Sequence, residues 1–241
     1  MCNSASLTAK QQKLEEHYRA KMAVPLLFEP YYHIAAYTFP NLFIIKQNEP
    51  DTIFPASWGF MPEHIKADPY HYRRRWKRWN ARVEKLFDHD SVYPDYIRNK
   101  RCLILADGFF EPHYYPGEKR AYPFYCYQPE NGGRKLFSFA GMYSEIDDEV
   151  LSCTIITTKA NAQFSEIHNR AKRMPLVLEP TFENEWLKQE INDTGLKELL
   201  KHGFTKEEFK AHPVSRNLFK KDIDTNTPAI VEPIEPPLTL F

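Results

Sequence analysis

The sequence predicts an α+β fold, in which one domain has a curved antiparallel sheet or barrel-like core and helices packed outside it. The chain of 241 residues is long enough for one full core. No linker, internal repeat or low-complexity tract interrupts it, so we expect a single domain over residues 1–241. Strand-like segments dominate the middle of the chain, and helical spacing of apolar residues dominates after Thr158.

The first third of the chain predicts both helices and strands. Apolar residues at helical spacing near the N-terminus indicate an amphipathic helix. Alternating Tyr, Ile and Phe residues, interrupted by Pro40-Asn41, are typical of a hairpin. A proline at a helix start is favourable because its missing N–H needs no partner there. The predicted elements are a helix over 7–22, a hairpin over 31–47, a strand near 52–60 and a helix that begins at Pro69 within 69–87.

The remainder of the chain predicts four strands and then a more helical part. Runs rich in aromatic and β-branched residues are separated by turn signals, which favours strands. The predicted strands cover 102–110, 121–128, 135–144 and 150–158. A helix over 160–168, a strand over 174–178 and helices over 181–190 and 194–202 follow, with Gly203 as the last stop signal. The proline-rich end after Pro228 is expected to be extended.

Charge and cysteine content exclude several classes of protein. Lys and Arg equal Asp and Glu at 32 each, so net charge indicates no polyanionic partner. Cysteine spacing gives neither a C-x-x-C pair nor a zinc site, and we expect no metal and no cofactor. Cys102, Cys126 and Cys153 lie in apolar strand-like runs and are predicted to be buried free thiols. We find no signal peptide and no membrane-length apolar run, and we therefore expect a soluble cytoplasmic protein.

Cys2 is the residue with the most distinctive chemistry, because it directly follows Met1. Its small side chain favours removal of that methionine, which leaves an α-amine and a thiol on adjacent carbons. Such a pair captures aldehydes: the amine forms a Schiff base, and the thiol closes it to a five-membered thiazolidine. The ordinary pKa values are about 7.7–8.0 for the amine and about 8.5 for the thiol, which suits neutral pH. A cysteine at this position can also occur by chance.

One concentrated basic run stands out against the balanced overall charge. Residues 70–79 interleave aromatic residues with arginine and lysine, including Arg73, Arg74 and Arg75. Single-stranded nucleic acid suits this pattern, since bases stack on aromatic rings and phosphates are neutralised by cations. A solvated helix face with two buried tryptophans explains the pattern equally well. Trp58 is predicted to belong to the core.

Several short motifs occur in a fixed order along nearly the whole chain. They are Cys2, Trp58-Gly59-Phe60-Met61-Pro62, Asn80-Ala81-Arg82-Val83-Glu84, Arg101-Cys102-Leu103-Ile104, Ala106-Asp107-Gly108-Phe109-Phe110-Glu111, Ile167-His168-Asn169-Arg170 with Met174-Pro175, and His212-Pro213-Val214-Ser215. In this order and with these gaps, the set resembles the SOS-response-associated peptidase (SRAP) family. The resemblance implies a protein that crosslinks to abasic sites in DNA.

The resemblance also implies roles for four residues beyond the cysteine. Glu111 matches the family's acid–base residue, and its apolar neighbours should raise its pKa by desolvation. His168 would act on the sugar oxygen so that the abasic deoxyribose opens to its aldehyde. Arg82 and Arg170 align with arginines that contact the DNA backbone. On local pattern alone, Glu111 could equally be a surface glutamate at a strand end, and His168 a helix-terminal histidine.

Asn80 is the last candidate of the site. Its side chain carries both a donor and an acceptor, so it could hold the α-amine or a sugar hydroxyl. An asparagine at this point could instead cap a helix or shape a turn. We therefore predict Cys2, Asn80, Glu111 and His168 as catalytic residues, and Arg73, Arg74, Arg75, Arg82 and Arg170 as DNA-binding residues.

The chain departs from the family pattern in four places. The usual Cys-Gly-Arg opening reads Cys2-Asn3-Ser4, and the usual Asn-x-x-Pro is replaced around His33-Ile34-Ala35-Ala36. Pro112 stands where a tryptophan normally follows Glu111. Three extra residues, Ala171-Lys172-Arg173, separate Arg170 from Met174. Loss of the opening arginine would weaken DNA binding unless Arg73, Arg74 and Arg75 compensate.

Three functions remain open at this level. The first is a monomeric protein that binds single-stranded DNA with abasic sites and forms a thiazolidine crosslink through Cys2, associating with the nucleoid when bound. The second is an N-terminal-nucleophile cysteine peptidase, which could also remove its own methionine. The third is a non-catalytic module for single-stranded nucleic acid, whose binding would depend on salt but not on Cys2.

Overall fold

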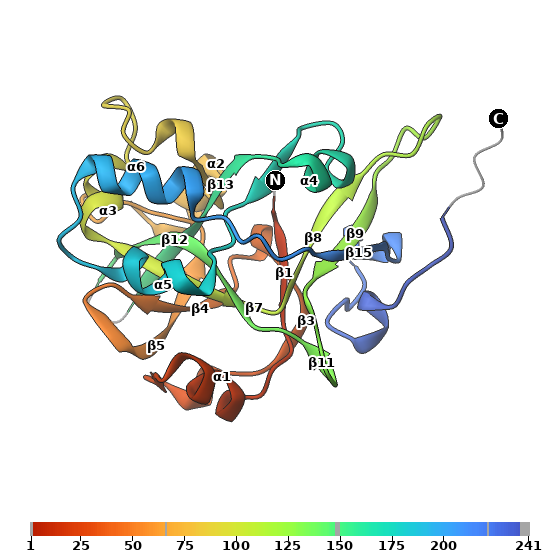
Figure 1. Ribbon diagram of the computed structural model, residues 1–241, viewed down its shortest axis with the longest axis horizontal. Coiled ribbons are helices and arrows are strands. Elements are labelled where there is room, and N and C mark those ends of the chain that lie inside the picture. The colour runs from red at the N-terminus through yellow and green to blue at the C-terminus, as the bar shows by residue number, and fades with distance from the viewer. Residues whose placement is uncertain (1, 66, 148–149, 221, 237–241) are drawn as a thin grey trace.

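The computed structural model describes residues 2–65, 67–147, 150–220 and 222–236. Two large sheets form the body of the molecule and helices lie against their outer faces (Figure 1). The predicted α+β fold with a curved, barrel-like sheet is confirmed. No helix within these described ranges combines the length and the apolar composition needed to cross a membrane.

The larger sheet curls into a ring. Its strand order is β14-β13-β12-β7-β4-β5-β2, and an additional parallel pairing between β13 and β5 joins the two sides. Five strands therefore close on themselves, which removes most exposed edges. The bounds are β2 Lys21–Met22, β4 Asn41–Lys46, β5 Glu49–Trp58, β7 Arg101–Ala106, β12 Phe137–Glu145, β13 Leu151–Lys159 and β14 Arg173–Pro175. The short strand β6, Asn80–Arg82, pairs in parallel with β13.

The second sheet carries the N-terminus. Its order is β15-β9-β8-β1-β3, with bounds β1 Ser4–Leu7, β3 Tyr31–Ala35, β8 Gly108–His113, β9 Tyr122–Tyr127 and β15 Lys210–Pro213. β1 lies between β3 and β8 and is antiparallel to both, with Ala5 opposite Phe109. This central position fixes the direction of the first residues, which run alongside the far half of β8.

In the described parts of the chain, six α-helices and several short elements complete the fold. The helices are α1 Gln11–Tyr18, α2 Pro69–Trp76, α3 Pro94–Asn99, α4 Ala162–Ile167, α5 Pro180–Leu187 and α6 Asp193–His202. The 3-10 helices are η1 Pro25–Leu27, η2 Ala36–Thr38, η3 Val83–Lys85, η4 Arg216–Phe219 and η5 Pro228–Val231, and a small hairpin joins β10 Pro129–Glu130 to β11 Gly133–Arg134. The sequence did not predict α3, β15 or this hairpin.

Asp107 divides what the sequence predicts as one strand over 102–110. Its carboxylate accepts hydrogen bonds from the hydroxyl of Ser6 at 2.8 Å and from the backbone N–H of Thr8 at 2.6 Å. The chain crosses from β7 in one sheet to β8 in the other at this point. Gly108 permits the crossing, because a Cβ there would lie 2.3 Å from the hydroxyl of Tyr125. The prediction of a single strand was therefore wrong.

Two other predictions at the N-terminal end need correction. The helix predicted over 7–22 is shorter, since β1 precedes α1 and β2 follows it. The hairpin predicted over 31–47 is wrong: β3 pairs with β1, whereas β4 pairs with β5 and β7 in the other sheet. Local alternation identified both strands, but their partners depend on segments far along the chain.

Apart from α2 and the end of the chain, the remaining predicted elements agree with the structure to within a few residues. α2 is shorter than the stretch 69–87, because the chain turns into β6 and η3. The predicted strand over 174–178 is β14, followed by isolated bridges at Val177 and Leu178. The end of the chain is less extended than expected, since η5 covers Pro228–Val231. All four cysteines are buried free thiols, and Trp58 is fully buried as predicted.

Arg101 stabilises the junction between the ring and two helices. Its guanidinium is completely buried and donates to the backbone carbonyls of Trp186 at 2.8 Å and Ile97 at 2.9 Å, and to those of Arg98 and Lys188. These carbonyls lie at the ends of α3 and α5, where backbone acceptors have no partner within the helix. One side chain therefore satisfies four buried acceptors.

We expect Arg101→Met to destabilise the protein by at least about 3 kcal/mol, because several buried carbonyls would lose their donor. Chemical denaturation of wild type and variant measures the difference in the free energy of unfolding. Arg98→Met is the matched control, because Arg98 is a half-exposed arginine whose pair with Asp193 is worth less than about 1 kcal/mol. Equal stabilities of the two variants would contradict the prediction.

Candidate functional site

Cys2 lies at the entrance to the second sheet, two residues before β1. It is completely buried, and its thiol donates to the backbone carbonyl of Ser4 at 3.7 Å. Burial raises the pKa of this thiol well above its usual value, and the nearby carboxylate of Glu111 raises it further. Cys2 is therefore a protonated thiol at neutral pH, held next to an acid–base group.

Glu111 lies within β8, and not at the end of a strand as the sequence suggested. Its exposed fraction is 1%, and its Oε2 is 3.1 Å from Nδ1 of His168, which is itself 3% exposed. Burial raises the pKa of Glu111 to about 7. The alternative of a solvated surface glutamate is excluded by this burial.

His168 follows α4 directly and points back toward β8. Asn161 caps the start of this helix by accepting the N–H of Phe164 at 2.9 Å. Nδ1 of His168 lies 2.9 Å from the carbonyl of Arg173, and since a carbonyl only accepts, the proton is on Nδ1. Nε2 is then the basic nitrogen. Burial lowers the pKa of His168 to about 4, so the imidazole is neutral at neutral pH.

The contact between Glu111 and His168 is therefore not a fixed ion pair. At neutral pH it joins a neutral imidazole to a carboxyl group that gains and loses its proton near pH 7. Groups whose pKa lies near the working pH transfer protons most effectively. The pair has the protonation states that proton transfer to and from a bound substrate requires.

Asn80 approaches the same place from the other sheet. β6 pairs with β13, with Asn80 opposite Ile155, and this pairing directs the side chain toward the N-terminus. Nδ2 of Asn80 donates to Oδ1 of Asn3 at 2.9 Å. Oδ1 of Asn80 is buried and has no hydrogen-bond partner in the part of the chain that the structure describes. Asn3, which replaces the family's glycine, thus links Cys2 to Asn80.

The four predicted catalytic residues therefore gather around the first residues of the chain. They come from the segment before β1, from β6, from β8 and from the end of α4. Figure 1 labels β1, β8 and α4 near the N-terminus. Asn80 is part of a strand and therefore does not cap a helix. His168 is the helix-terminal residue that the local pattern suggested, since it is the C-cap of α4, and its ring also contacts Glu111.

The predicted phosphate-binding arginines occupy different surroundings. Arg82 is exposed at the end of β6. Arg170 is exposed in the loop after α4, and its guanidinium lies 3.6 Å from the ring centroid of Tyr114. Asn169 fixes that loop against Tyr114, whose backbone N–H and carbonyl it binds at 3.1 Å and 2.8 Å.

Arg173 is a site residue that the sequence analysis overlooked. It lies on β14 directly before Met174, and it contacts Glu84 at 2.6 Å and the carbonyl of Thr157 at 2.7 Å. Its own carbonyl orients His168. The signal was present, because Arg173-Met174-Pro175 is contiguous whereas Arg170 is separated from Met174 by three residues. Arg173 therefore positions His168 through contacts within the protein, whereas Arg170 is exposed to solvent.

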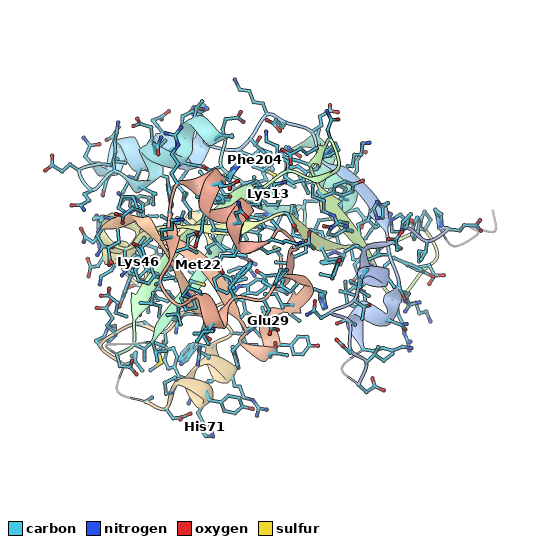
Figure 2. All side chains as sticks on the ribbon, turned by 90° about the horizontal axis from the view of Figure 1, so that it is seen from below. Lys13, Met22, Glu29, Lys46, His71 and Phe204 are labelled. Carbon is cyan, nitrogen blue, oxygen red and sulfur yellow. The ribbon has the colours of Figure 1, made fainter. Side chains whose placement is uncertain are left out.

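The basic run forms α2, which projects at one margin of the molecule, where Figure 2 labels His71. Arg74 and Arg75 are exposed and lie over the rings of Tyr70 and Trp76. Trp76 is half exposed, so the alternative that requires two buried tryptophans is excluded. Arg73 differs from its neighbours.

Arg73 is half buried and is committed to contacts within the protein. It donates to the hydroxyl of Ser57 and to the carbonyl of Pro69 at 3.1 Å, and it lies 5.2 Å from the ring centroid of Phe39. These contacts anchor α2 to the ring. Of the three arginines, only Arg74 and Arg75 have the exposure that a phosphate contact needs. Within the described ranges, no group of three or more His, Cys, Asp or Glu residues is arranged to hold a metal ion.

Comparison with known proteins gives consistent matches over most of the chain. A family model described as SOS response associated peptidase (SRAP) matches residues 1–221. The chain is 27% identical over 239 residues to the abasic site processing protein YoqW of Bacillus subtilis (strain 168), a match that covers 96% of this chain and 99% of that protein. It is 29% identical over 215 residues to the abasic site processing protein YedK of Escherichia coli (strain K12), covering 86% and 90%. A crystal structure of a protein from Bacteroides thetaiotaomicron has a TM-score of 0.82 and 27% identity, covering 97% of this chain and all of that one.

Proposed function

Since the chain belongs to the SOS response associated peptidase (SRAP) family, we propose that it processes abasic sites in single-stranded DNA by forming a covalent thiazolidine through Cys2. The observation that carries this proposal is the gathering of Cys2, Glu111 and His168 at one buried point, with Asn80 linked to it through Asn3. The names of YoqW and YedK as abasic site processing proteins support it.

The reaction requires removal of Met1 and then proceeds in two stages. The freed α-amine of Cys2 adds to the aldehyde carbon of the opened deoxyribose and gives a carbinolamine. Loss of one water produces an imine. The sulfur then bonds to the imine carbon, and the thiol proton moves to the nitrogen, which closes the ring. The net change is the release of one water molecule.

The surrounding residues supply the proton transfers. Glu111, with a pKa of about 7, donates a proton to the departing hydroxyl and can take the proton of the thiol. Nε2 of neutral His168 accepts or returns the proton during ring opening of the sugar. The buried Oδ1 of Asn80 accepts from the α-amine or a sugar hydroxyl. No metal or cofactor enters any of these steps.

The structure favours this chemistry over general peptide hydrolysis. A cysteine peptidase attacks as a thiolate, and its cysteine usually has a lowered pKa. Burial raises the pKa of Cys2, and the carboxylate of Glu111 raises it further. An imine is a stronger electrophile than an amide, and its closure needs the thiolate only transiently. Removal of Met1 by the protein itself is a separate proposal that the family description as a peptidase supports.

The test is to incubate the purified protein with single-stranded DNA that contains one abasic site. A heat-stable, slower-migrating band whose mass equals protein plus DNA minus one water supports the proposal. N-terminal mass analysis of the unreacted protein shows whether Met1 has been removed. A protein with a free Cys2 amine that gives no such band would overturn the proposal.

DNA binding should depend on the exposed arginines of α2. We expect Arg74→Ala/Arg75→Ala to weaken binding to single-stranded DNA, and to reduce the slope of log affinity against log salt by up to about 1.4, since each lost phosphate contact contributes about 0.7. Fluorescence anisotropy over a range of salt concentrations measures both effects. Arg19→Ala is a suitable control, because Arg19 ends α1 on the side of the molecule away from α2 (Figure 1). An unchanged salt slope in the double variant would exclude α2 from the interface.

A further inference from the structure

A cleft lies where η3, β13, β14 and α6 meet, and none of the proposed catalytic residues lines it. Its volume is about 480 Å³, which is within the usual range for a ligand site. Phe87, Met174 and Phe204 contribute to an apolar floor. Lys159, Lys197 and Lys201 line the same cleft and are exposed. The cleft therefore combines aromatic surface with three cations.

Nearby carboxylates compensate only part of the positive charge of this cleft. No acidic side chain lines it, and none of the three lysines forms an ion pair within the described parts of the chain. Glu84 pairs with Arg173, and Asp193, whose carboxylate also interacts with Lys197, pairs with Arg98. Glu198 contacts His202, which balances its charge only when the histidine is protonated. Nζ of Lys197 lies 5.0 Å from the ring centroid of Phe87, which places this cation over the apolar floor. An anion with a flat apolar part fits such a site.

The cleft lies close to the proposed reaction site. Val83 lines it and follows Asn80 by three residues, a distance of about 10 Å along an extended backbone. On the neighbouring strands, Lys159 is opposite Arg173, and Met174 follows Arg173. A DNA strand that leaves the reaction site past the exposed Arg82 would reach the cleft directly.

We propose that the cleft binds one unpaired nucleotide of the same DNA strand, a short distance from the abasic residue. The base lies against Phe87 and Phe204, and Lys159, Lys197 and Lys201 neutralise the adjacent phosphates. Every base has a π-face that can stack on an aromatic ring, so binding here tolerates any sequence. The inference rests on the proposed function, and it adds a second point at which the strand is held.

Binding of intact oligonucleotides tests the cleft separately from the crosslinking reaction. Fluorescence anisotropy would compare a short single strand of about five nucleotides with strands extended on the 5′ or the 3′ side to about fifteen. The variant Lys197→Glu/Lys201→Glu should lose on the order of tenfold in affinity for one of the extended strands and little for the short one. Its salt slope for the extended strand should fall by about 1.4.

The matched control is Lys10→Glu/Lys13→Glu, which makes the same charge change at α1, on the opposite side of the molecule from α6 (Figure 1). A loss confined to one extended strand and to the α6 variant supports the cleft. Equal losses for short and extended strands, or equal losses in the control, would overturn it. If the protein binds extended strands through the cleft but forms no crosslink with abasic DNA, the proposed function is wrong and nucleotide binding by the cleft is still supported.

Discussion

Cys2→Ala is expected to abolish the heat-stable crosslink to abasic single-stranded DNA, while binding to intact single-stranded DNA remains within about twofold of wild type. Without the sulfur, the α-amine still forms an imine, but the ring cannot close and the imine hydrolyses. Gel electrophoresis after heating measures the crosslink. Chemical reduction of the variant with borohydride before heating should recover a band, because reduction traps the imine.

Two further variants test whether the crosslink needs a sulfur atom at position 2 in particular. Cys2→Ser keeps a small polar side chain and should behave as Cys2→Ala does, with a band only after reduction. Cys126→Ala removes a thiol near Cys2 and Glu111 that has no adjacent α-amine, and it should leave the crosslink unchanged. A stable crosslink in Cys2→Ala without reduction would show that another residue forms the bond.

Glu111→Gln is expected to slow crosslink formation by a factor of about 10² or more, since a positioned acid–base group contributes roughly 10²–10⁴. The pH dependence should also change. Protonated Glu111 declines as pH rises through about 7, whereas the free amine increases up to its pKa of about 7.7–8.0. Wild type should therefore show a maximum near neutral pH, and the variant should keep only the rising limb. Single-turnover crosslinking rates between pH 5.5 and 8.5, roughly spanning both pKa values, measure this.

The same substitution is expected to stabilise the folded protein. Burial raises the pKa of Glu111 from 4.5 to about 7, so the folded state binds more protons than the unfolded state between these values. Stability conferred by the protonated carboxyl is complete below pH 4.5 and is lost as pH rises through 7. Well above pH 7, ionisation of the buried carboxyl lowers the free energy of unfolding by about 3 kcal/mol. Glu111→Gln should recover much of that at pH 8 and almost none at pH 4.5, as chemical denaturation at the two pH values would show.

Glu183→Gln serves as the control for both effects. Glu183 is a glutamate of α5 whose pKa is raised to about 6 by burial. It accepts a hydrogen bond from Ser138 and takes no part in the proposed site. Its substitution should change the pH dependence of stability in the same direction and leave the crosslinking rate unaffected. If Glu111→Gln reacts at the wild-type rate, Glu111 is not the proton donor.

The sequence predicted most strands but not how they pair. Alternation of apolar residues identified β3 and β4, yet β3 pairs with the N-terminal β1, which local pattern did not reveal because Ser4–Leu7 is only four residues long. Asp107 is an ordinary turn residue in sequence, and its part in joining the sheets depends on Ser6 and Thr8, about a hundred positions away. Pairing between distant segments has no local signal.

The residues of the candidate site could be predicted more completely than the pairing of the strands, because the motifs indicated residues that the structure brings together. The motifs predict Glu111 and His168 separately as residues that move protons, and the structure places the two side chains 3.1 Å apart. The arginines were less predictable. Arg73, Arg74 and Arg75 are adjacent in sequence, but α2 turns one toward Ser57 and Phe39 and leaves two exposed. Helical rotation separates neighbours onto different faces.

The burial of Cys2 constrains when Met1 can be removed. In the folded protein Cys2 is fully buried, and β1 is held between β3 and β8. β8 ends at His113, so the enclosing sheet cannot assemble until nearly half the chain has left the ribosome. At about 5–20 residues per second, an aminopeptidase acting on the nascent chain has roughly 5–20 s of unobstructed access. Co-translational maturation and folding therefore compete for the same terminus, and a chain that folds with its methionine in place would depend on removal of Met1 by the protein's own site.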